Sequence, residues 1–278
     1  MILKLKEHLG SLEKEHKEKT TFWATEAESM AFDIYHKWIG TKPTNPPDAH
    51  TQMIFNAGKM MEIALVEQLE DAGLIIATPE EQLHIEMTRG VPISGYVDAV
   101  HVDGSPIEIK TFYGTYAVRD LKMGKPRVSY LKQLAIYMDA LKQKKGYLIY
   151  MERGTGELFE FELHTNNFKK FRCLDIEFDI EDTYKRWGRL YDLNILPKVE
   201  PKPDYRYKIP VSEIDWRTLS KSNIGKARNG QKVIGDHPLA VQYSNYKNLI
   251  IEKEGASIGY TQSEITQIKN LTKGYTTW

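Results

Sequence analysis

The sequence predicts an α/β (α+β) fold in which helices flank a β-sheet. Three changes of pattern along the chain predict this class. Helical spacing over residues 52–71 stops before Gly73, short β-rich runs follow, and helical spacing returns over residues 128–145 before two more strands. Apolar side chains on one face recur about every 3.6 residues in a helix and every two residues in a strand, so each change marks a new type of element.

Glycine, proline and asparagine mark where the expected elements end. Gly40 and the run TKPTNPPD end a first helix, Gly73 ends a second, and Gly146 ends a third. The charged segment 1–19 has leucines at helical spacing and is expected to form a short helical arm. In order, the sequence predicts a helix over 26–39, a helix over 52–71, strands in LIIAT, LHIEM, ISGYVDAVHV and PIEIKTF, a helix over 128–145, strands GYLIYM and LFEFEL, and a long helix over 167–191.

A proline-rich stretch at residues 196–210 predicts an extended connector. We therefore expect a core with its N-terminal arm over 1–195, and a connector with a basic C-terminal module over 196–278. Residues 1–200 hold 26 Lys+Arg against 31 Asp+Glu, whereas 201–278 hold 12 against 7. The basic module is either a structural appendage or a surface that contacts phosphates and stacks bases. Its candidate aromatic residues are Tyr205, Tyr207, Trp216, Tyr243 and Tyr246.

Composition excludes several classes of site and location. The whole chain carries 38 basic and 38 acidic side chains, so its net charge does not favour nucleic acid. Cys173 is the single cysteine, which excludes an intramolecular disulfide and a cysteine-held iron–sulfur cluster. The N-terminal segment lacks the apolar run of a signal peptide, and no stretch approaches the roughly 20 apolar residues that span a bilayer. We expect a cytoplasmic protein with no membrane partner.

Glu62 is a candidate functional residue because it interrupts an apolar helix face. On the helix expected over 52–71, Phe55, Leu65 and Leu69 lie on the same face at spacings of three and seven residues. An ionised carboxylate is costly to bury unless a cation or a metal accompanies it. Two interpretations stay open: Glu62 faces inward towards a metal, or a lysine or arginine neutralises it at the edge of the apolar face.

The strand PIEIKTF places Glu108 and Lys110 on one face. Whether Asp98, on the preceding strand, shares that face depends on the hairpin loop, because a shift of one residue inverts every side chain. A three-residue loop, Asp103-Gly104-Ser105, sets Asp98 opposite Lys110 with Glu108 diagonal to it. A two-residue Asp-Gly turn would set Asp98 opposite Ile109 and separate the two carboxylates. We expect the three-residue loop.

With that register, Asp98, Glu108 and an inward Glu62 converge on one point. Ligation by oxygen atoms alone favours Mg²⁺ or Mn²⁺ and disfavours zinc, which prefers Cys and His. Such a cation would stabilise charge on a phosphate and lower the pKa of a bound water, as phosphodiester hydrolysis requires. Lys110 could orient that water or help to deprotonate it. Taken alone, a Glu-x-Lys tripeptide on a strand is more often a solvated surface.

Four short motifs follow one another within residues 20–165. They are Gly58-x-x-x-Glu62, Asp98, Glu108-Ile109-Lys110 and Gln133-x-x-x-Tyr137, each on the type of element expected above. This arrangement resembles the PD-(D/E)XK nuclease superfamily, and specifically its RecB/Cas4-like exonuclease branch. The chain departs from that pattern in having glutamate where the first motif often has histidine, and Tyr130 where many relatives have histidine. It also lacks the four cysteines of the iron–sulfur members, so no such cluster is expected.

The resemblance implies a restriction-endonuclease-like αβββαβ core with a central mixed sheet flanked by helices. It implies that Glu62, Asp98, Glu108 and the Ile109 carbonyl bind Mg²⁺ or Mn²⁺, with two ions expected, and that Lys110 is the catalytic base or positions the reactants. Three residues on the following helix would support the site or contact the DNA backbone: Tyr130, Gln133 and Tyr137.

The expected function is that of a metal-dependent DNA exonuclease in recombination, repair or phage DNA processing. It would contact the DNA phosphate backbone, in the cytoplasm of a bacterial or phage-infected cell. A restriction-like or structure-specific endonuclease is an alternative with the same core, and a DNA-binding protein that keeps the nuclease fold without turnover is another. A homo-oligomer and a recombination partner protein both stay open.

Overall fold

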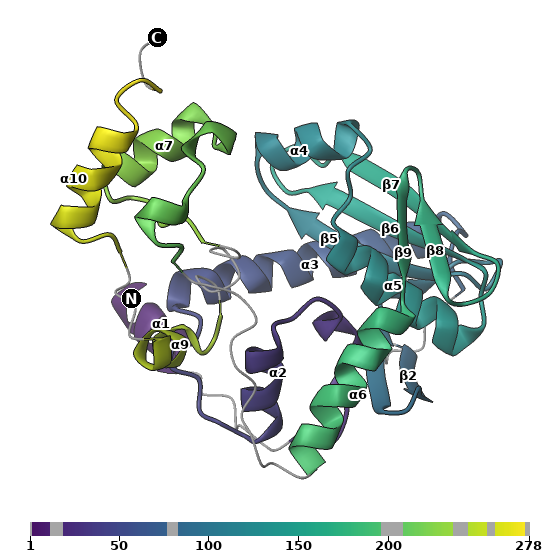
Figure 1. Cartoon of the computed structure of the whole chain (residues 1–278). Coiled ribbons are helices and arrows are strands. Elements are labelled where there is room, and N and C mark those ends of the chain that lie inside the picture. Colours follow the sequence, from purple (N-terminus) through teal and green to yellow (C-terminus); the bar gives the residue numbers. More distant parts are fainter. Residues whose placement is uncertain are drawn as a thin grey trace. The chain divides into compact units, whose positions relative to one another are not determined.

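The computed structural model describes residues 2–11, 19–76, 83–195, 208–235, 244–254 and 259–275 (Figure 1). Their strands are short, and most follow the β-rich runs of the sequence. The strands are β1 Phe22–Trp23, β2 Leu83–Thr88, β3 Pro92–Val97, β4 Ala99–Val100, β5 Pro106–Phe112, β6 Lys145–Glu152, β7 Leu158–Thr165, β8 Lys170–Cys173 and β9 Ile176–Asp179.

The helices alternate with these strands. The α-helices are α1 Ile2–Ser11, α2 Ala31–Trp38, α3 Ala49–Asp71, α4 Thr115–Lys122, α5 Val128–Leu141, α6 Glu181–Ile195, α7 Lys221–Arg228, α9 Lys247–Glu254 and α10 Gln262–Leu271, and the 3-10 helices are Ala24–Glu26, Val211–Glu213 and Trp216–Thr218.

The strands of the described residues form two sheets. The larger has the order β4-β5-β6-β7-β8-β9, and the smaller has the order β1-β3-β2. In the larger sheet β5 runs parallel to β6, whereas the other neighbours are antiparallel, so the sheet is mixed. Helices flank these mixed sheets, which confirms the predicted α+β class.

Two helices cover opposite faces of the larger sheet. Leu65 on α3 packs with Ile107 and Ile109 on β5, so α3 covers the face that carries the odd-numbered residues of that strand. On β6, a Cβ added to Gly146 would lie 2.9 Å from the sulfur of Met138, so α5 packs closely against the other face. That second face carries the even-numbered residues of β5, which include both members of the Glu-x-Lys motif.

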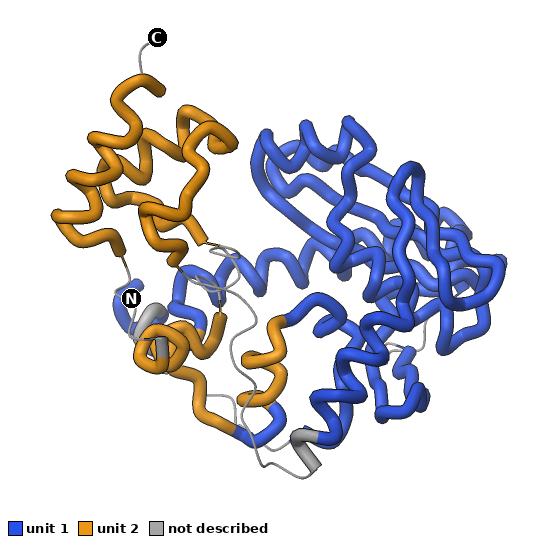
Figure 2. The backbone as a smooth tube through the Cα atoms, viewed as in Figure 1, with its two compact units in different colours: residues 1–29, 38–40, 47–199 blue, residues 30–37, 41–46, 200–278 orange. Residues whose placement is uncertain are grey.

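The chain divides into two compact units (Figure 2). The first comprises residues 1–29, 38–40 and 47–199, and the second comprises 30–37, 41–46 and 200–278. Two segments from the N-terminal part therefore belong with the C-terminal unit. Apart from 208–210, the connector expected over 196–210 lies outside the described residues, and so it stays a prediction.

The second unit contains two apolar clusters. One joins α2 to α9, where Phe32, Tyr246 and Ile250 are buried together. The other holds together the 3-10 helices, α7 and α10, and Thr261 begins α10 with a reciprocal capping interaction to Glu264. The second cluster consists of Val211, Trp216, Ile224, Ala227, Ile234, Tyr260, Ile265 and Ile268.

Three predicted helices differ from the structure. The helix expected over 167–191 begins only at Glu181, because residues 170–179 form the hairpin β8–β9, in which Phe171 and Cys173 alternate inward at strand spacing. The helix expected over 26–39 is a 3-10 turn followed by α2. The helix expected over 128–145 ends at Leu141, because the next residue is left-handed.

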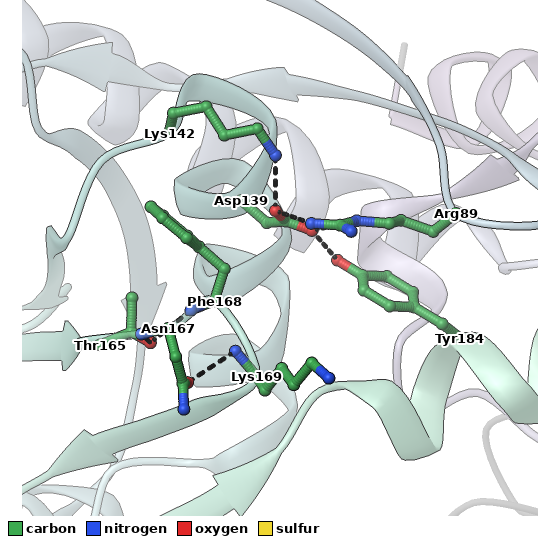
Figure 3. Close-up of polar contacts among 8 residues, drawn as sticks. All are labelled: Arg89, Asp139, Lys142, Thr165, Asn167, Phe168, Lys169 and Tyr184. Atoms are coloured by element: carbon green, nitrogen blue, oxygen red, sulfur yellow. Dashed lines mark hydrogen bonds and ion pairs between the residues drawn. The ribbon is translucent and has the colours of Figure 1, made fainter.

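A buried acidic residue, Asp139, ties α5 to two other elements (Figure 3). Its carboxylate accepts hydrogen bonds from Arg89 Nε at 2.8 Å and from Tyr184 Oη at 3.1 Å. Lys142 Nζ lies 2.9 Å from the same carboxylate and 5.5 Å from the ring centroid of Phe168. Although burial raises the pKa of Asp139, the hydrogen bonds from Arg89 and Lys142 outweigh it, so the pKa is lowered.

No helix in the described part of the chain is long and apolar enough to cross a membrane.

The Asp139 network generates a stability prediction. Asp139→Ala should lower the free energy of unfolding by about 3 kcal/mol, because it leaves the cation of Arg89 and the hydroxyl of Tyr184 without their shared acceptor. Lys142→Ala is the control and should cost less than about 1 kcal/mol, since that lysine is 64% exposed. Urea denaturation of both variants at pH 7 measures the difference.

The same comparison has an expected pH dependence. A lowered carboxyl pKa contributes stability above the unfolded-state pKa and loses it as pH falls through the folded-state value. The gap between wild type and Asp139→Ala should therefore narrow below about pH 4. A gap that is constant from pH 7 to pH 3, or equal costs for both variants, would contradict the network.

Candidate active site

The β4–β5 hairpin brings two acidic residues to the same face. Ala99 pairs with Ile107, so the preceding residue, Asp98, comes to the position opposite Glu108. The expectation that Asp98 faces Lys110 was wrong, but the two carboxylates do share a face as expected. Close approach of two carboxylates makes each harder to ionise.

The register differs because the hairpin loop begins one residue earlier than expected. The N–H of His101 donates to the carbonyl of Ser105 at 2.9 Å, so the loop is 102–104 rather than 103–105. Gly104 takes the left-handed position with φ 87°. Moving a three-residue loop by one residue shifts the strand pairing by two, which changes the opposite residue and preserves the face.

Asp98 lies where the chain leaves β3 of the smaller sheet and enters β4 of the larger. Its Oδ2 accepts a hydrogen bond of 2.7 Å from the backbone N–H of Ile109, which fixes the carboxylate at the edge of β5. Burial raises the pKa of Asp98 to about 6, with the charge of Lys110 lowering it and that of Glu62 raising it. The strand edge therefore holds a carboxyl group that is harder to ionise than a solvent-exposed aspartate.

Glu108 is fully buried on β5 and forms an ion pair with Lys110 through Oε1. Its Oε2 has no hydrogen-bond partner among the residues described. Burial, and then the charge of Asp98, raise the pKa of Glu108 to about 8 against the attraction of Lys110. A buried carboxylate with an unused oxygen is unfavourable for folding, and such groups concentrate at functional sites.

Lys110 contacts the buried acidic pair and is itself partly exposed to solvent. Its side chain is 25% exposed, and Nζ lies 5.1 Å from the ring centroid of Tyr130, which favours the charged form. Burial lowers the pKa of Lys110, but the charges of Glu108 and Asp98 outweigh it and raise the pKa. The lysine is therefore an ammonium group at neutral pH.

Glu62 on α3 is near this site but does not point fully inward. Its side chain is 20% exposed and Oε1 lies 2.6 Å from Lys59 Nζ, one turn earlier on the helix. Of the two interpretations, neutralisation by a lysine at the edge of the apolar face is the one found. Phe55, expected on the buried face, is 55% exposed. The charge of Glu62 nevertheless raises the pKa of both other acids.

Glycine on α3 explains how the helix comes so close to β5. A Cβ added to Gly58 would lie 3.0 Å from Thr111 Oγ1, so a larger residue would push the helix away from the strand. Glu62 follows one helical turn later on the same face. The glycine thus lets α3, the helix that carries Glu62, lie close to β5.

The charges of the site fit a divalent cation. Burial and mutual repulsion raise the pKa values of Asp98 and Glu108, so a cation beside them would favour their ionised forms. Carboxylate oxygens with no sulfur or imidazole ligand favour Mg²⁺ or Mn²⁺. Within the part of the chain that the structure describes, however, no three His, Cys, Asp or Glu side chains are grouped closely enough to hold a metal.

Gln133 and Tyr137 lie beneath the acids rather than on the surface. Both are buried on α5, and Gln133 Nε2 donates to Tyr137 Oη at 2.8 Å. Burial, and then the charge of Glu108, raise the pKa of Tyr137. A Cβ added to Gly95 would lie 2.8 Å from the Tyr137 ring, so β3 needs glycine there to admit the tyrosine. Their burial favours support of Glu108 over contact with DNA.

A pocket of about 350 Å³ opens beside Lys110. Its walls come from the end of β5, from α4, from the start of α5 and from Tyr150 on β6. Motif spacing missed these residues, but the density of tyrosines and cations between the Glu-x-Lys tripeptide and the next helix was a signal that could have found them. The lining residues are Lys110, Thr111, Phe112, Tyr113, Gly114, Tyr116, Ala117, Asp120, Leu121, Lys125, Arg127, Tyr130 and Tyr150.

The C-terminal module holds five aromatic residues that were candidates for stacking on bases. Trp216 and Tyr246 are buried in the apolar clusters of the second unit, which excludes them from stacking on a ligand in this conformation. The other three, Tyr205, Tyr207 and Tyr243, lie outside the described residues.

Comparison of the whole chain with solved structures found distant similarities. The crystal structure of a protein designated SSO0001 matches with 19% identity and a TM-score of 0.44, covering 72% of this chain and 86% of that one. An alkaline exonuclease from Laribacter hongkongensis, LHK-Exo, matches with 16% identity and a TM-score of 0.39, covering 69% and 96%. LHK-Exo in complex with dAMP matches with 16% identity and a TM-score of 0.42, covering 64% and 89%. No protein-family model and no curated protein gives a match.

The raised pKa of Glu108 generates a second stability prediction. A raised carboxyl pKa contributes stability below the unfolded-state value and loses it as pH rises through the folded-state value, here about 8. In EDTA, wild type should therefore lose stability relative to Glu108→Gln as the pH rises. The unfolding free energy of the variant minus that of wild type should increase by more than about 1 kcal/mol between pH 5 and pH 8. Urea denaturation at the two pH values measures it.

Glu160→Gln, at an exposed position of β7, is the matched control and should show no such change with pH. If the two variants behave alike, Glu108 does not carry the burial penalty assigned to it.

Proposed function

We propose that this chain is a divalent-metal-dependent DNA exonuclease of the PD-(D/E)XK superfamily, in its RecB/Cas4-like branch. One observation carries the proposal: Asp98 and Glu108 are brought together in buried surroundings beside Lys110, which also lines a pocket. Buried acids paired with a lysine also occur in purely structural networks, but those seldom leave a carboxylate oxygen without a partner. Nothing else among the described residues combines these features.

The proposed cofactor is Mg²⁺ or Mn²⁺, with two ions. Its ligands would be the carboxylates of Asp98, Glu108 and Glu62 and the carbonyl of Ile109. When bound, the metal would stabilise charge on the scissile phosphate and lower the pKa of a bound water. The site accepts hard cations because every proposed ligand atom is an oxygen.

Residues of the chain would orient the metal ligands and the reactants. The hydrogen bond from Ile109 N–H orients Asp98, so the carboxylate does not rotate freely at the strand edge. Lys110 is held protonated by its acidic neighbours, and an ammonium group can donate hydrogen bonds but cannot accept a proton. Of its two expected roles, the geometry therefore supports orienting water or a phosphate oxygen over acting as the base. Tyr130 limits where the ammonium group can move.

The biological setting stays a prediction. Recombination, repair and phage DNA processing all require exonucleases, and a cytoplasmic location, a homo-oligomer and a partner protein rest on the sequence alone. A restriction-like or structure-specific endonuclease would use the same residues, because the core chemistry does not depend on how DNA enters. A DNA-binding protein without turnover is favoured by none of the geometry above.

The catalytic assignment predicts that Asp98→Asn, Glu108→Gln and Lys110→Met each lower cleavage of end-labelled linear DNA in Mg²⁺ or Mn²⁺ by at least about 100-fold. Asp175→Asn, Glu160→Gln and Lys170→Met make the same chemical changes at exposed positions of the same unit and should keep wild-type rates. Circular dichroism checks that each variant is folded. Cleavage that persists in any of the three site variants would remove that residue from the mechanism.

Linear and circular DNA separate the two enzymatic alternatives. An exonuclease leaves covalently closed circles intact and degrades linear DNA from its ends, and EDTA should stop it. Cleavage of circles at a comparable rate would establish the endonuclease instead.

Metal binding can be tested without turnover. Mn²⁺ should raise the melting temperature of wild type more at pH 8 than at pH 5.5, because protons compete for Asp98 and Glu108 at the lower pH. Glu62→Gln should reduce this shift if Glu62 is a ligand. Glu67→Gln, at an exposed position of the same helix, should leave it unchanged. An equal shift in both variants would remove Glu62 from the ligand set.

A further inference from the structure

The pocket beside Lys110 has a lining that the proposed chemistry does not require. Hydrolysis needs the acids and the lysine, yet the pocket continues past Lys110 to α4 and the start of α5, where tyrosines and cations line it. Its volume of about 350 Å³ is at the lower end of the range for small-molecule sites, roughly 300 to 1,000 Å³. A space of this size suits one nucleotide.

Two tyrosines at this pocket are unusually exposed. Tyr113 is 75% exposed and Tyr116 is 77% exposed, among the highest values for large apolar side chains in the described chain. An exposed aromatic ring gains stability when a second flat ring covers it, and proteins that bind single strands use tyrosines in this way. The cation of Arg119, 5.5 Å from the centre of the Tyr116 ring, helps to hold that ring in place.

The loop that carries Tyr113 is held rigidly. Gly114 has φ 120°, a conformation that requires glycine, and its N–H donates to Glu152 Oε1 at 3.3 Å. Glu152 Oε2 also accepts from the N–H groups of Gly154 and Thr155, each at 2.7 Å. A Cβ added to Gly154 would lie 3.2 Å from the Tyr113 ring, so the ring rests against this turn. A platform fixed in advance loses little entropy when it binds.

Positive charge completes the lining. Lys125 and Arg127 line the pocket together with Lys110, and the Arg127 guanidinium lies 5.8 Å from the centre of the Tyr130 ring. The one carboxylate of the lining, Asp120, is 3.2 Å from Arg119, which offsets part of its charge. Cations beside stacking rings are the combination that tracks a nucleic-acid backbone and its bases.

We propose that this pocket holds an unpaired nucleotide of the substrate strand next to the scissile phosphate. The base stacks on Tyr113 or Tyr116, and Lys125 and Arg127 bind the neighbouring phosphate. This inference rests on the proposed nuclease function and adds the substrate class: a single strand, or a duplex end whose last nucleotide is separated from its partner.

The test measures binding of the full chain in EDTA to a single-stranded oligonucleotide carrying 2-aminopurine, whose fluorescence falls when it stacks. Alanine at the tyrosine on which the base stacks, Tyr113→Ala or Tyr116→Ala, should weaken binding about 10-fold and restore fluorescence, whereas Tyr113→Phe and Tyr116→Phe should keep both the affinity and the quenching. Lys125→Gln and Arg127→Gln should weaken binding and reduce its salt dependence. Tyr275→Ala, at an exposed position in the other unit, is the control for general loss of an aromatic residue.

Two results would overturn the proposal. One is tyrosine-to-alanine variants that bind and quench as wild type does, and the other is equal affinity for a blunt duplex without 2-aminopurine quenching. Because the binding assay needs no turnover, it can contradict the proposed pocket without contradicting the proposed nuclease function, and the reverse also holds. Binding and quenching without Mg²⁺- or Mn²⁺-dependent cleavage refutes the nuclease and supports the pocket. Cleavage of single strands at equal rates by wild type and a Tyr113→Ala, Tyr116→Ala double variant refutes the pocket alone.

Discussion

The carboxyl group of Glu108, buried on β5 beside Asp98 and paired with Lys110, is the constraint on which the site depends. Neither acid is easily ionised there, and the cost of burying them must be recovered from packing elsewhere. Glycines at two positions make that packing possible. Gly58 leaves room for α3 to lie close to β5, and Gly95 leaves room for the Tyr137 ring beside β3. The first unit is thus arranged around a group that disfavours folding, as functional sites commonly are.

This arrangement separates a rigid, buried acidic centre from an open cationic one. The acids lie between the sheet and α5. The pocket is lined by Lys110, by tyrosines and by Lys125 and Arg127. Lys110 belongs to both, because it pairs with Glu108 and also lines the pocket. A zero net charge for the whole chain therefore conceals local charges of opposite sign, and it is the local charges that a phosphate group would meet.

Some sequence predictions were wrong where two patterns fitted one segment. Residues 170–179 are short and mixed enough to read as the start of a helix, yet buried Phe171 and Cys173 alternate as strand residues do. For Glu62 the sequence left two orientations open, because helix periodicity gives the direction of a side chain but not how deeply it is buried. The helix is partly open to solvent at that turn, so Lys59 reaches the carboxylate.

The sequence by itself determined the α+β class, the alternation that puts Glu108 and Lys110 on one strand face, and a three-residue hairpin loop that contains Gly104. These follow from local rules, because side-chain direction repeats with the backbone and only glycine tolerates some turn conformations. Tertiary structure decided that Asp98 lies opposite Glu108, how deeply each acid is buried, and that tyrosines after the motif line a pocket. Pairing register, burial and enclosure depend on contacts between residues far apart in the chain, and no local pattern encodes those distances.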